Sequence, residues 1–133
     1  MITLLEGIQT FFQADATLAA LDGPWLDVAP DKKTYPYCVM IDSGGPISAC
    51  FDLRILQQRS VTFRIYHTDY ATLRTYQAAM HDRFDRGDFA LTAGLLRSAT
   101  RTNDFRGFAG RDKDNKTIFV ATSVYRFTVQ GSF

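Results

Sequence analysis

Two stretches of the chain repeat hydrophobic residues at the three-to-four-residue spacing of an amphipathic helix. The stripe of the N-terminal stretch comprises Leu4, Leu5, Ile8, Phe11 and Phe12. In the second stretch, residues 69–86, the stripe comprises Tyr70, Leu73, Tyr76 or Gln77, Met80 and Phe84, and the outer face carries Arg74, Ala78, His81, Asp82 and Asp85. Thr68 or Asp69 can cap the start of this second helix, and Gly87 is suited to end it.

Four further segments have the patterns of β-strands. Residues 60–67 alternate between hydrophobic and polar side chains, and their hydrophobic face consists of Val61, Phe63 and Ile65. Residues 37–41 form a continuous hydrophobic run, which is typical of a strand covered on both faces. Residues 117–130 predict a long final strand, and the weak alternation of residues 95–102 indicates a partner for it.

The segments between these elements have weaker patterns. Asp22, Gly23 and Pro24 are expected to stop a short turn, and residues 25–28 to form a short extended piece. The stretch from Gly44 to Gln58 is read as a long loop or an extended hairpin arm. Residues 103–116 are rich in Gly and Asp, so they predict a hairpin connection longer than a tight two-residue turn.

The order of these elements predicts an α+β fold, with an antiparallel twisted sheet of about four strands and the two main helices packed on one face. A length of 133 residues fits a single domain over residues 1–133. The chain is 46% hydrophobic and 22% charged, which is ordinary for a globular protein. Its eleven Phe and six Tyr exceed the needs of such a core and favour an additional contact surface.

The overall charge excludes some classes of partner. Fifteen basic and fourteen acidic residues leave a net charge of +1, so no global field attracts the protein to nucleic acid or anionic lipid. The N-terminal residues lack a basic cluster and include Glu6, and no hydrophobic stretch is long enough to span a bilayer. We therefore expect a protein made in the cytoplasm that has no contact with a membrane.

Few residues have the spacing that chemistry requires. His67 and Asp69 could form a base and its orienting carboxylate, or they could end a strand and cap a helix. Cys38 and Cys50 match neither a redox pair nor a zinc site; Cys38 is expected to be buried, and their redox state is left open. The sequence thus predicts no cofactor and no metal site.

A basic stretch with interleaved aromatic residues lies near the C-terminus. Its members are Arg97, Arg101, Phe105, Arg106, Phe108, Arg111, Lys113 and Lys116. Aromatic rings among cations can hold single-stranded nucleic acid, but Asp104, Asp112 and Asp114 offset half of the charge. A solvated hairpin is therefore the preferred interpretation, with at most weak, non-specific contact with DNA.

With its elements in this order, the chain resembles a known family from about residue 4 to residue 130. The segments that carry the resemblance are residues 15–21, 28–30, 35–41 and 59–66, the helix from Tyr70 to Phe84, the turn at residues 112–116 and the strand at residues 125–129. They are similar to the tail-completion proteins of long-tailed phages and prophages, also called tail-terminator or head-tail joining proteins. The order and spacing of the segments carry the match, since none of them is a chemical motif.

The resemblance implies a non-enzymatic structural subunit of a phage or prophage tail. It would form a ring with copies of itself, typically hexameric, at the head-proximal end of the tail tube, and would join tail-tube and head-connector proteins. It would be found in the host cytoplasm during assembly and then in the virion tail. Such a ring requires exposed edges and apolar patches that are covered on assembly.

Six residues are candidates for contact with other subunits or partners: Phe51, Leu53, Ile55, Leu56, Arg106 and Arg111. The first four lie in the arm that ends at Gln58, where they could equally extend the next strand and be buried in the same subunit. The two arginines would line or rim the channel of a ring. Two alternatives stay open: a small enzyme that uses His67 and Asp69, and a module that binds a peptide by strand addition.

Overall fold

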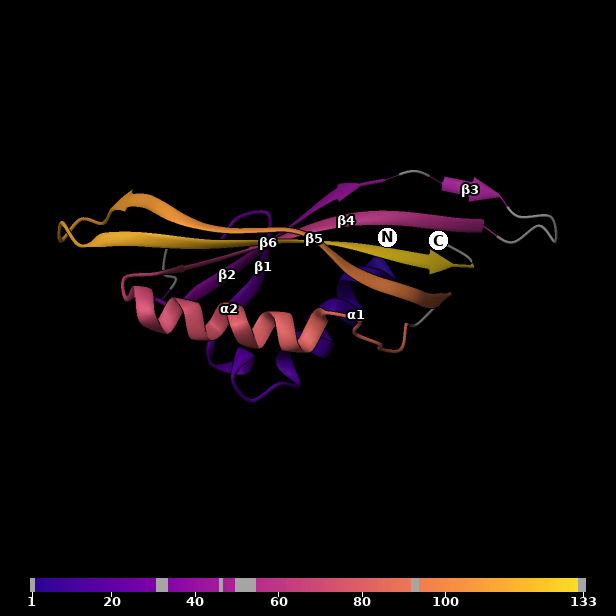
Figure 1. Cartoon of the computed structure of the whole chain (residues 1–133), viewed down its shortest axis with the longest axis horizontal. Helices are drawn as coiled ribbons and strands as arrows, with labels where there is room; N and C mark the ends of the chain where they lie inside the picture. Colours follow the sequence, from indigo (N-terminus) through magenta and orange to yellow (C-terminus); the bar gives the residue numbers. More distant parts are fainter. Residues whose placement is uncertain (1, 31–33, 46, 50–54, 92–93, 132–133) are drawn as a thin grey trace.

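The computed structural model describes residues 2–30, 34–45, 47–49, 55–91 and 94–131. Within these ranges the elements follow one another along the chain (Figure 1). They are α1 (Ile2–Gln13), the 3₁₀ helix η1 (Leu18–Ala20), β1 (Asp22–Leu26), β2 (Tyr37–Gly44), β3 (Ile47–Ala49), β4 (Ile55–His67), α2 (Tyr70–Phe84), β5 (Leu95–Arg111) and β6 (Thr117–Gln130). Both α-helices lie on the same side of the sheet (Figure 1).

The sheet is larger and more mixed than the sequence pattern predicts. Its main order is β1-β2-β4-β6-β5, and β3 pairs with the first part of β4. The pairs among β2, β4, β6 and β5 are antiparallel, as expected, whereas β1 runs parallel to β2. At Gly23 of β1 a Cβ atom would lie 2.4 Å from the carbonyl oxygen of Cys38, so only glycine allows this close approach.

The hairpin of β5 and β6 differs most from the prediction. Residues 103–111 were expected to belong to the connection, but they continue β5 and pair with β6 as far as Arg111 opposite Thr117. The turn itself is residues 112–116, where Asp112 Oδ1 accepts hydrogen bonds from the backbone of Asp114 and Lys116, both at 2.9 Å. Glycine and polar residues suggested a loop, whereas pairing with a long β6 decides the structure.

The core lies between the helices and the covered face of the sheet. From α1 it includes Leu4, Ile8 and Phe12, and from α2 it includes Leu73, Met80 and Phe84. The ring of Phe84 lies within 6.4 Å, between centroids, of Phe11, Phe12, Phe63, Phe89, Tyr125 and Phe127. Both predicted helical stripes are confirmed, except that Tyr70 is 41% exposed at the start of α2.

Most of the strand residues that the sequence predicts to be buried are buried in the structure. Val61, Phe63 and Ile65 are buried on the helix side of β4. All of residues 37–40 are buried, which confirms a strand covered on both faces. On the side away from the helices, the ring of Tyr37 stacks on Tyr66 of β4 at 4.9 Å. Cys38 is fully buried, as predicted, and burial raises the pKa of its thiol well above the ordinary range.

Candidate interaction surface

Two hairpins project from opposite ends of the sheet (Figure 1). One is built by β3 and β4, where Ile47, Ser48 and Ala49 pair with Gln57, Leu56 and Ile55. The other is the end of the β5–β6 hairpin, which extends past the start of α2. The extended-arm interpretation of the first segment is therefore correct for its paired residues.

The predicted contact residues are divided between the two hairpins. Phe51 and Leu53 lie outside the described residues. Ile55 begins β4, and Leu56 is half-buried in the same strand opposite Gln130 of β6. The strand extension that sequence reasoning allowed for Ile55 and Leu56 is thus observed in the backbone. Their contact with another subunit stays a prediction.

The two predicted arginines lie on β5. Arg106 is exposed but bends toward α2, where its Nη1 donates to Gln77 Oε1 at 2.6 Å and its Nε to the Tyr70 hydroxyl at 3.2 Å. Arg111 is exposed at the end of the strand, and its Nη1 donates to the Asn115 carbonyl at 3.5 Å. The structure therefore does not bring the two side chains together.

A polar cluster that sequence reasoning missed joins α2 to β5 and β6. His81 was assigned to the outer face of α2, but it is half-buried: its Nε2 lies 3.1 Å from Ser123 Oγ and its Nδ1 2.5 Å from Arg101 Nη1. The guanidinium of Arg101 also lies 3.3 Å from Asp85 and 3.6 Å from Asp104. Helical periodicity could not reveal this cluster, because the partners of His81 lie on β5 and β6.

The contacts of His81 fix its protonation. A guanidinium can only donate hydrogen bonds, so Nδ1 accepts from Arg101 and the ring proton sits on Nε2, facing Ser123. Burial lowers the pKa of His81, and the positive charge of Arg101 lowers it further. His81 is therefore a neutral, structural group that links the helix to the sheet.

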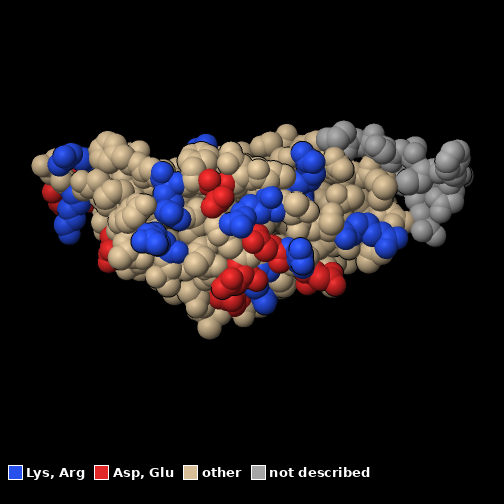
Figure 2. Space-filling model, in the orientation of Figure 1, with Lys and Arg blue, Asp and Glu red and all other residues tan. Residues whose placement is uncertain are grey.

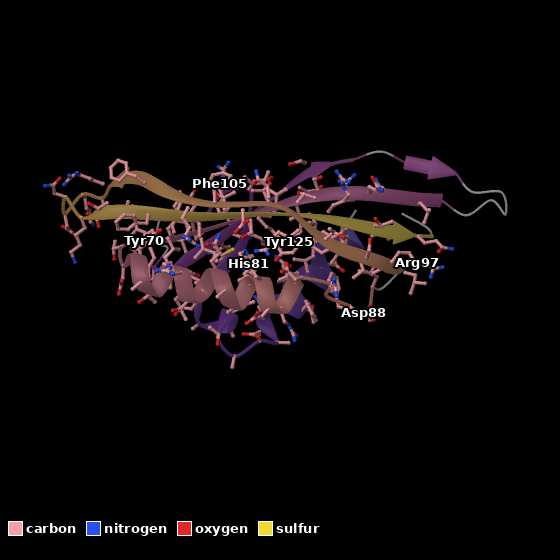
Figure 3. The ribbon with its side chains drawn as sticks, in the orientation of Figure 1. Tyr70, His81, Asp88, Arg97, Phe105 and Tyr125 are labelled. Carbon is pink, nitrogen blue, oxygen red and sulfur yellow. The ribbon has the colours of Figure 1, made fainter. Side chains whose placement is uncertain are left out.

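Tyr125 completes the attachment of α2 to the sheet. It is fully buried in β6, and its hydroxyl donates a 2.7 Å hydrogen bond to Asp85 just after α2 (Figure 3). Burial raises the pKa of Tyr125 above its ordinary value, and the bond to Asp85 adds to the rise. The phenol is therefore a hydrogen-bond donor under ordinary conditions rather than a base.

An open groove of about 410 Å³ runs along α2 beside β5. It is lined by Ala71, Arg74, Thr75, Gln77, Ala78, His81 and Arg106. Its polar groups bond to one another, since Arg106 contacts Gln77 and His81 contacts Arg101 and Ser123. These groups are therefore engaged in polar contacts within the chain.

His67 and Asp69 have the structural roles that the sequence offered as the alternative to catalysis. β4 ends at His67, and Asp69 caps α2 by accepting from the backbone of Ala71 at 3.1 Å and from the Thr72 hydroxyl at 2.8 Å. These hydrogen bonds lower the pKa of Asp69. Burial lowers the pKa of His67. The carboxylate of Asp69 is thus engaged with the helix rather than with the imidazole.

Neither a metal cluster nor a membrane-spanning helix is found in the part of the chain that the structure describes. No three His, Cys, Asp or Glu side chains of these residues come together as metal ligands. No helix among them has the length and apolar character to cross a bilayer.

Large hydrophobic side chains are exposed at the two edges of the sheet. Within the described residues they are Trp25, Leu26 and Val28 at β1, Leu95, Phe105 and Phe108 on β5, and Tyr70 beside β5. Phe105 lies on the side of the sheet opposite to His81 and Tyr125 (Figure 3). Basic side chains are spread over the surface shown in Figure 2, and acidic ones gather near its lower edge.

Comparison with known proteins identifies the fold. No protein-family profile matches the chain, and no curated protein sequence does. Among solved structures, the chain is similar to one in the "Virion of native gene transfer agent (GTA) particle", with a TM-score of 0.71 and 21% sequence identity. The match covers 97% of this chain and 96% of that one. The two chains share one fold over nearly their whole lengths.

Proposed function

We propose that this chain is a structural subunit of a phage or phage-like particle. The observation that carries the proposal is the similarity in fold, over nearly the whole of both chains, to a chain of a gene transfer agent virion. The order of sequence segments that resembles tail-completion proteins supports the same role independently. On that basis we assign the chain to the head-proximal end of a tail tube, where a ring of copies joins the tube to the head connector.

The surface of the molecule has the features that ring assembly requires. Two hairpins project beyond the helices, and the exposed large hydrophobic residues of the described chain lie at the sheet edges. Exposed apolar patches on a folded protein mark contact sites, and a closed ring needs two different patches on each subunit. Several polar groups, in contrast, are engaged in caps and internal hydrogen bonds, as at Asp69, His81, Arg106 and Tyr125.

The proposed role determines the partners and the location of the chain. Its partners are copies of itself, tail-tube proteins and head-connector proteins, met first in the host cytoplasm and then in the virion tail. DNA passing through the ring would meet Arg and Asp side chains of β5 and its turn, with weak, salt-sensitive contact. The chain is not assigned any enzymatic activity or cofactor.

The test is deletion of the gene from a host that produces the particle. We expect filled heads and separate tails, with tubes that exceed the normal length, because nothing ends their growth or joins them. Electron microscopy and a virus-titre or transfer assay measure the result, and supply of the wild-type chain from a plasmid should restore joined particles. Particles of normal length and infectivity without the chain would contradict the proposal.

A further inference from the structure

Five of the exposed hydrophobic residues lie in two separate patches. We define the β1 patch as Trp25, Leu26 and Val28, and the β5 patch as Phe108 with the neighbouring Tyr70 on the helix side of the sheet. Val28 is 78% exposed and Phe108 is 64% exposed, so most of the surface of these two residues contacts solvent. Side chains of this kind lose the most contact with water if another molecule covers them.

The sheet topology places the two patches on opposite edges. In the order β1-β2-β4-β6-β5, β1 pairs only with β2 and β5 only with β6. A patch on each of two opposite edges is the arrangement that a head-to-tail contact requires, since one subunit then presents a different surface to each neighbour. Closure of such a contact by rotation gives a ring.

The charges of the two edges are complementary. Within the described residues of β1 and the turn after it, the charged side chains are Asp22 and Asp27. On β5 and the turn after it they are six basic residues (Arg97, Arg101, Arg106, Arg111, Lys113 and Lys116) and three acids (Asp104, Asp112 and Asp114). Arg101 is paired internally with Asp85 and Asp104, but the basic residues outnumber the acids and leave the β5 edge cationic. Two β1 edges, or two β5 edges, would repel each other.

The backbone of both edges disfavours a continuous sheet between subunits. Pro24 of β1 has no N–H to donate, and the pairing of β5 shifts register after Leu96, Arg101 and Phe108. Such interruptions interfere with the addition of a further strand. Contact between the two edges must therefore be made by side chains.

From these observations we infer that the β1 patch of one copy binds the β5 patch of the next copy, through hydrophobic side chains flanked by Asp27 on one copy and Arg106 and Arg111 on the other. The inference rests on the proposed ring and specifies its contact. The occupant of each patch is a second copy of this chain.

Cross-linking between two cysteine variants tests the contact directly. The background is C50S, which leaves the buried Cys38 as the native thiol. V28C and F108C are prepared separately, one with a mass tag, and mixed at high concentration with a flexible bis-maleimide. We expect the mixed V28C–F108C product to exceed either self-linked product several-fold, and to decrease at high salt because the flanking charges are screened.

The matched control is D82C, an exposed position on α2. Paired with either patch variant, it should give only the yield of random collision. A V28C–F108C yield equal to that of this control would overturn the inference, as would preferential self-linking of either patch. The measurement decides the question even if the wild-type chain is monomeric when dilute, because cross-linking captures weak contacts.

Blocked variants give a second readout where the wild type forms rings. V28D and F108D each place a carboxylate in a hydrophobic patch, where burial against the facing hydrophobic side chains is unfavourable, so each variant alone should remain a monomer by light scattering. An equimolar mixture should form a dimer and nothing larger, because one intact pair of patches remains. Rings that persist in either variant would overturn the inference but leave the proposed function intact, whereas normal particles from the gene deletion would contradict the proposed function itself.

Discussion

The body of the molecule and the projecting end of the β5–β6 hairpin are built from the same two strands but in opposite ways. In the body, β6 buries Ala121, Tyr125, Phe127 and Val129 against the helices. Toward the projecting end of β5, Phe105 is 53% exposed and Phe108 is 64% exposed. Pairing between the two strands therefore determines how long the hairpin is, whereas contact with the helices determines which of its residues are buried in the core.

The largest expected effect is the loss of the central ring of the body. F84A should lower the free energy of unfolding by about 3–5 kcal/mol, because it removes a fully buried phenyl group and leaves a cavity among surrounding rings. Chemical denaturation monitored by circular dichroism measures the change.

The matched variant in the projecting end is F108A. It removes the same group from a side chain that is 64% exposed, so the free energy of unfolding should change by no more than about 0.5 kcal/mol. Equal losses for F84A and F108A would show that the projecting end belongs to the cooperative core, and the comparison between the two regions would not hold.

The next effect concerns the hydrogen bond that attaches α2 to β6. Y125F keeps the buried ring but removes the hydroxyl that donates to Asp85, and it should cost about 1 kcal/mol of unfolding free energy at neutral pH. Because folding raises the pKa of Tyr125, the folded state favours the protonated phenol. The stabilisation should therefore be present below pH 10 and be lost as the pH rises above it.

The pH dependence of stability distinguishes the contribution of Tyr125 from that of the other tyrosines. The wild type should lose stability in alkaline solution more steeply than Y125F, and the two curves should approach each other as the pH rises. Denaturation midpoints measured at several pH values test this. Parallel curves would mean that the hydroxyl of Tyr125 does not contribute through its bond to Asp85.

A smaller effect is expected at the cap of α2. D69A removes the acceptor for the backbone of Ala71 and for the Thr72 hydroxyl, so it should destabilise the first turn of the helix. D69N retains an acceptor and should recover most of the stability, which distinguishes a cap from a charge. Since the pKa of Asp69 is lowered, the benefit should be present at neutral pH and decline as the carboxylate is protonated in acid.

The periodic parts of the fold could be predicted from the sequence, because each pattern depends only on the spacing of residues within one helix or strand. The stripes from Leu4 to Phe12 and from Leu73 to Phe84 follow helical spacing, and the alternation of Val61, Phe63 and Ile65 follows the pleat of a strand. These patterns depend on burial by one adjacent surface. An α+β fold with two helices on one face followed from them.

The remaining features depend on distant partners. Residues 103–111 are rich in turn-forming residues, and only the length of β6 opposite them makes them a strand. The parallel pairing of β1 with β2 likewise leaves no periodic signal in a five-residue strand. The positive charge of Arg106, one of the predicted contact residues, is evident from the sequence. Its hydrogen bonds to Tyr70 and Gln77 could not be predicted, because these partners belong to α2.

The smallest expected effect belongs to His81, where the projecting hairpin joins the body. Its pKa is lowered from 6.5 by burial and by Arg101, so the folded state favours the neutral ring. The unfolded chain then binds the proton more readily, and stability should be full above pH 6.5 and decline as the pH falls below it. H81Q, which cannot titrate, should lose less stability than the wild type between neutral and mildly acidic pH.

H67Q is the matched control, because the pKa of His67 is also lowered but its imidazole lies at the end of β4, away from Arg101. If the body and the hairpin are joined through His81, acid should increase hydrogen exchange at residues 101–104 of β5 in the wild type and in H67Q, but not in H81Q.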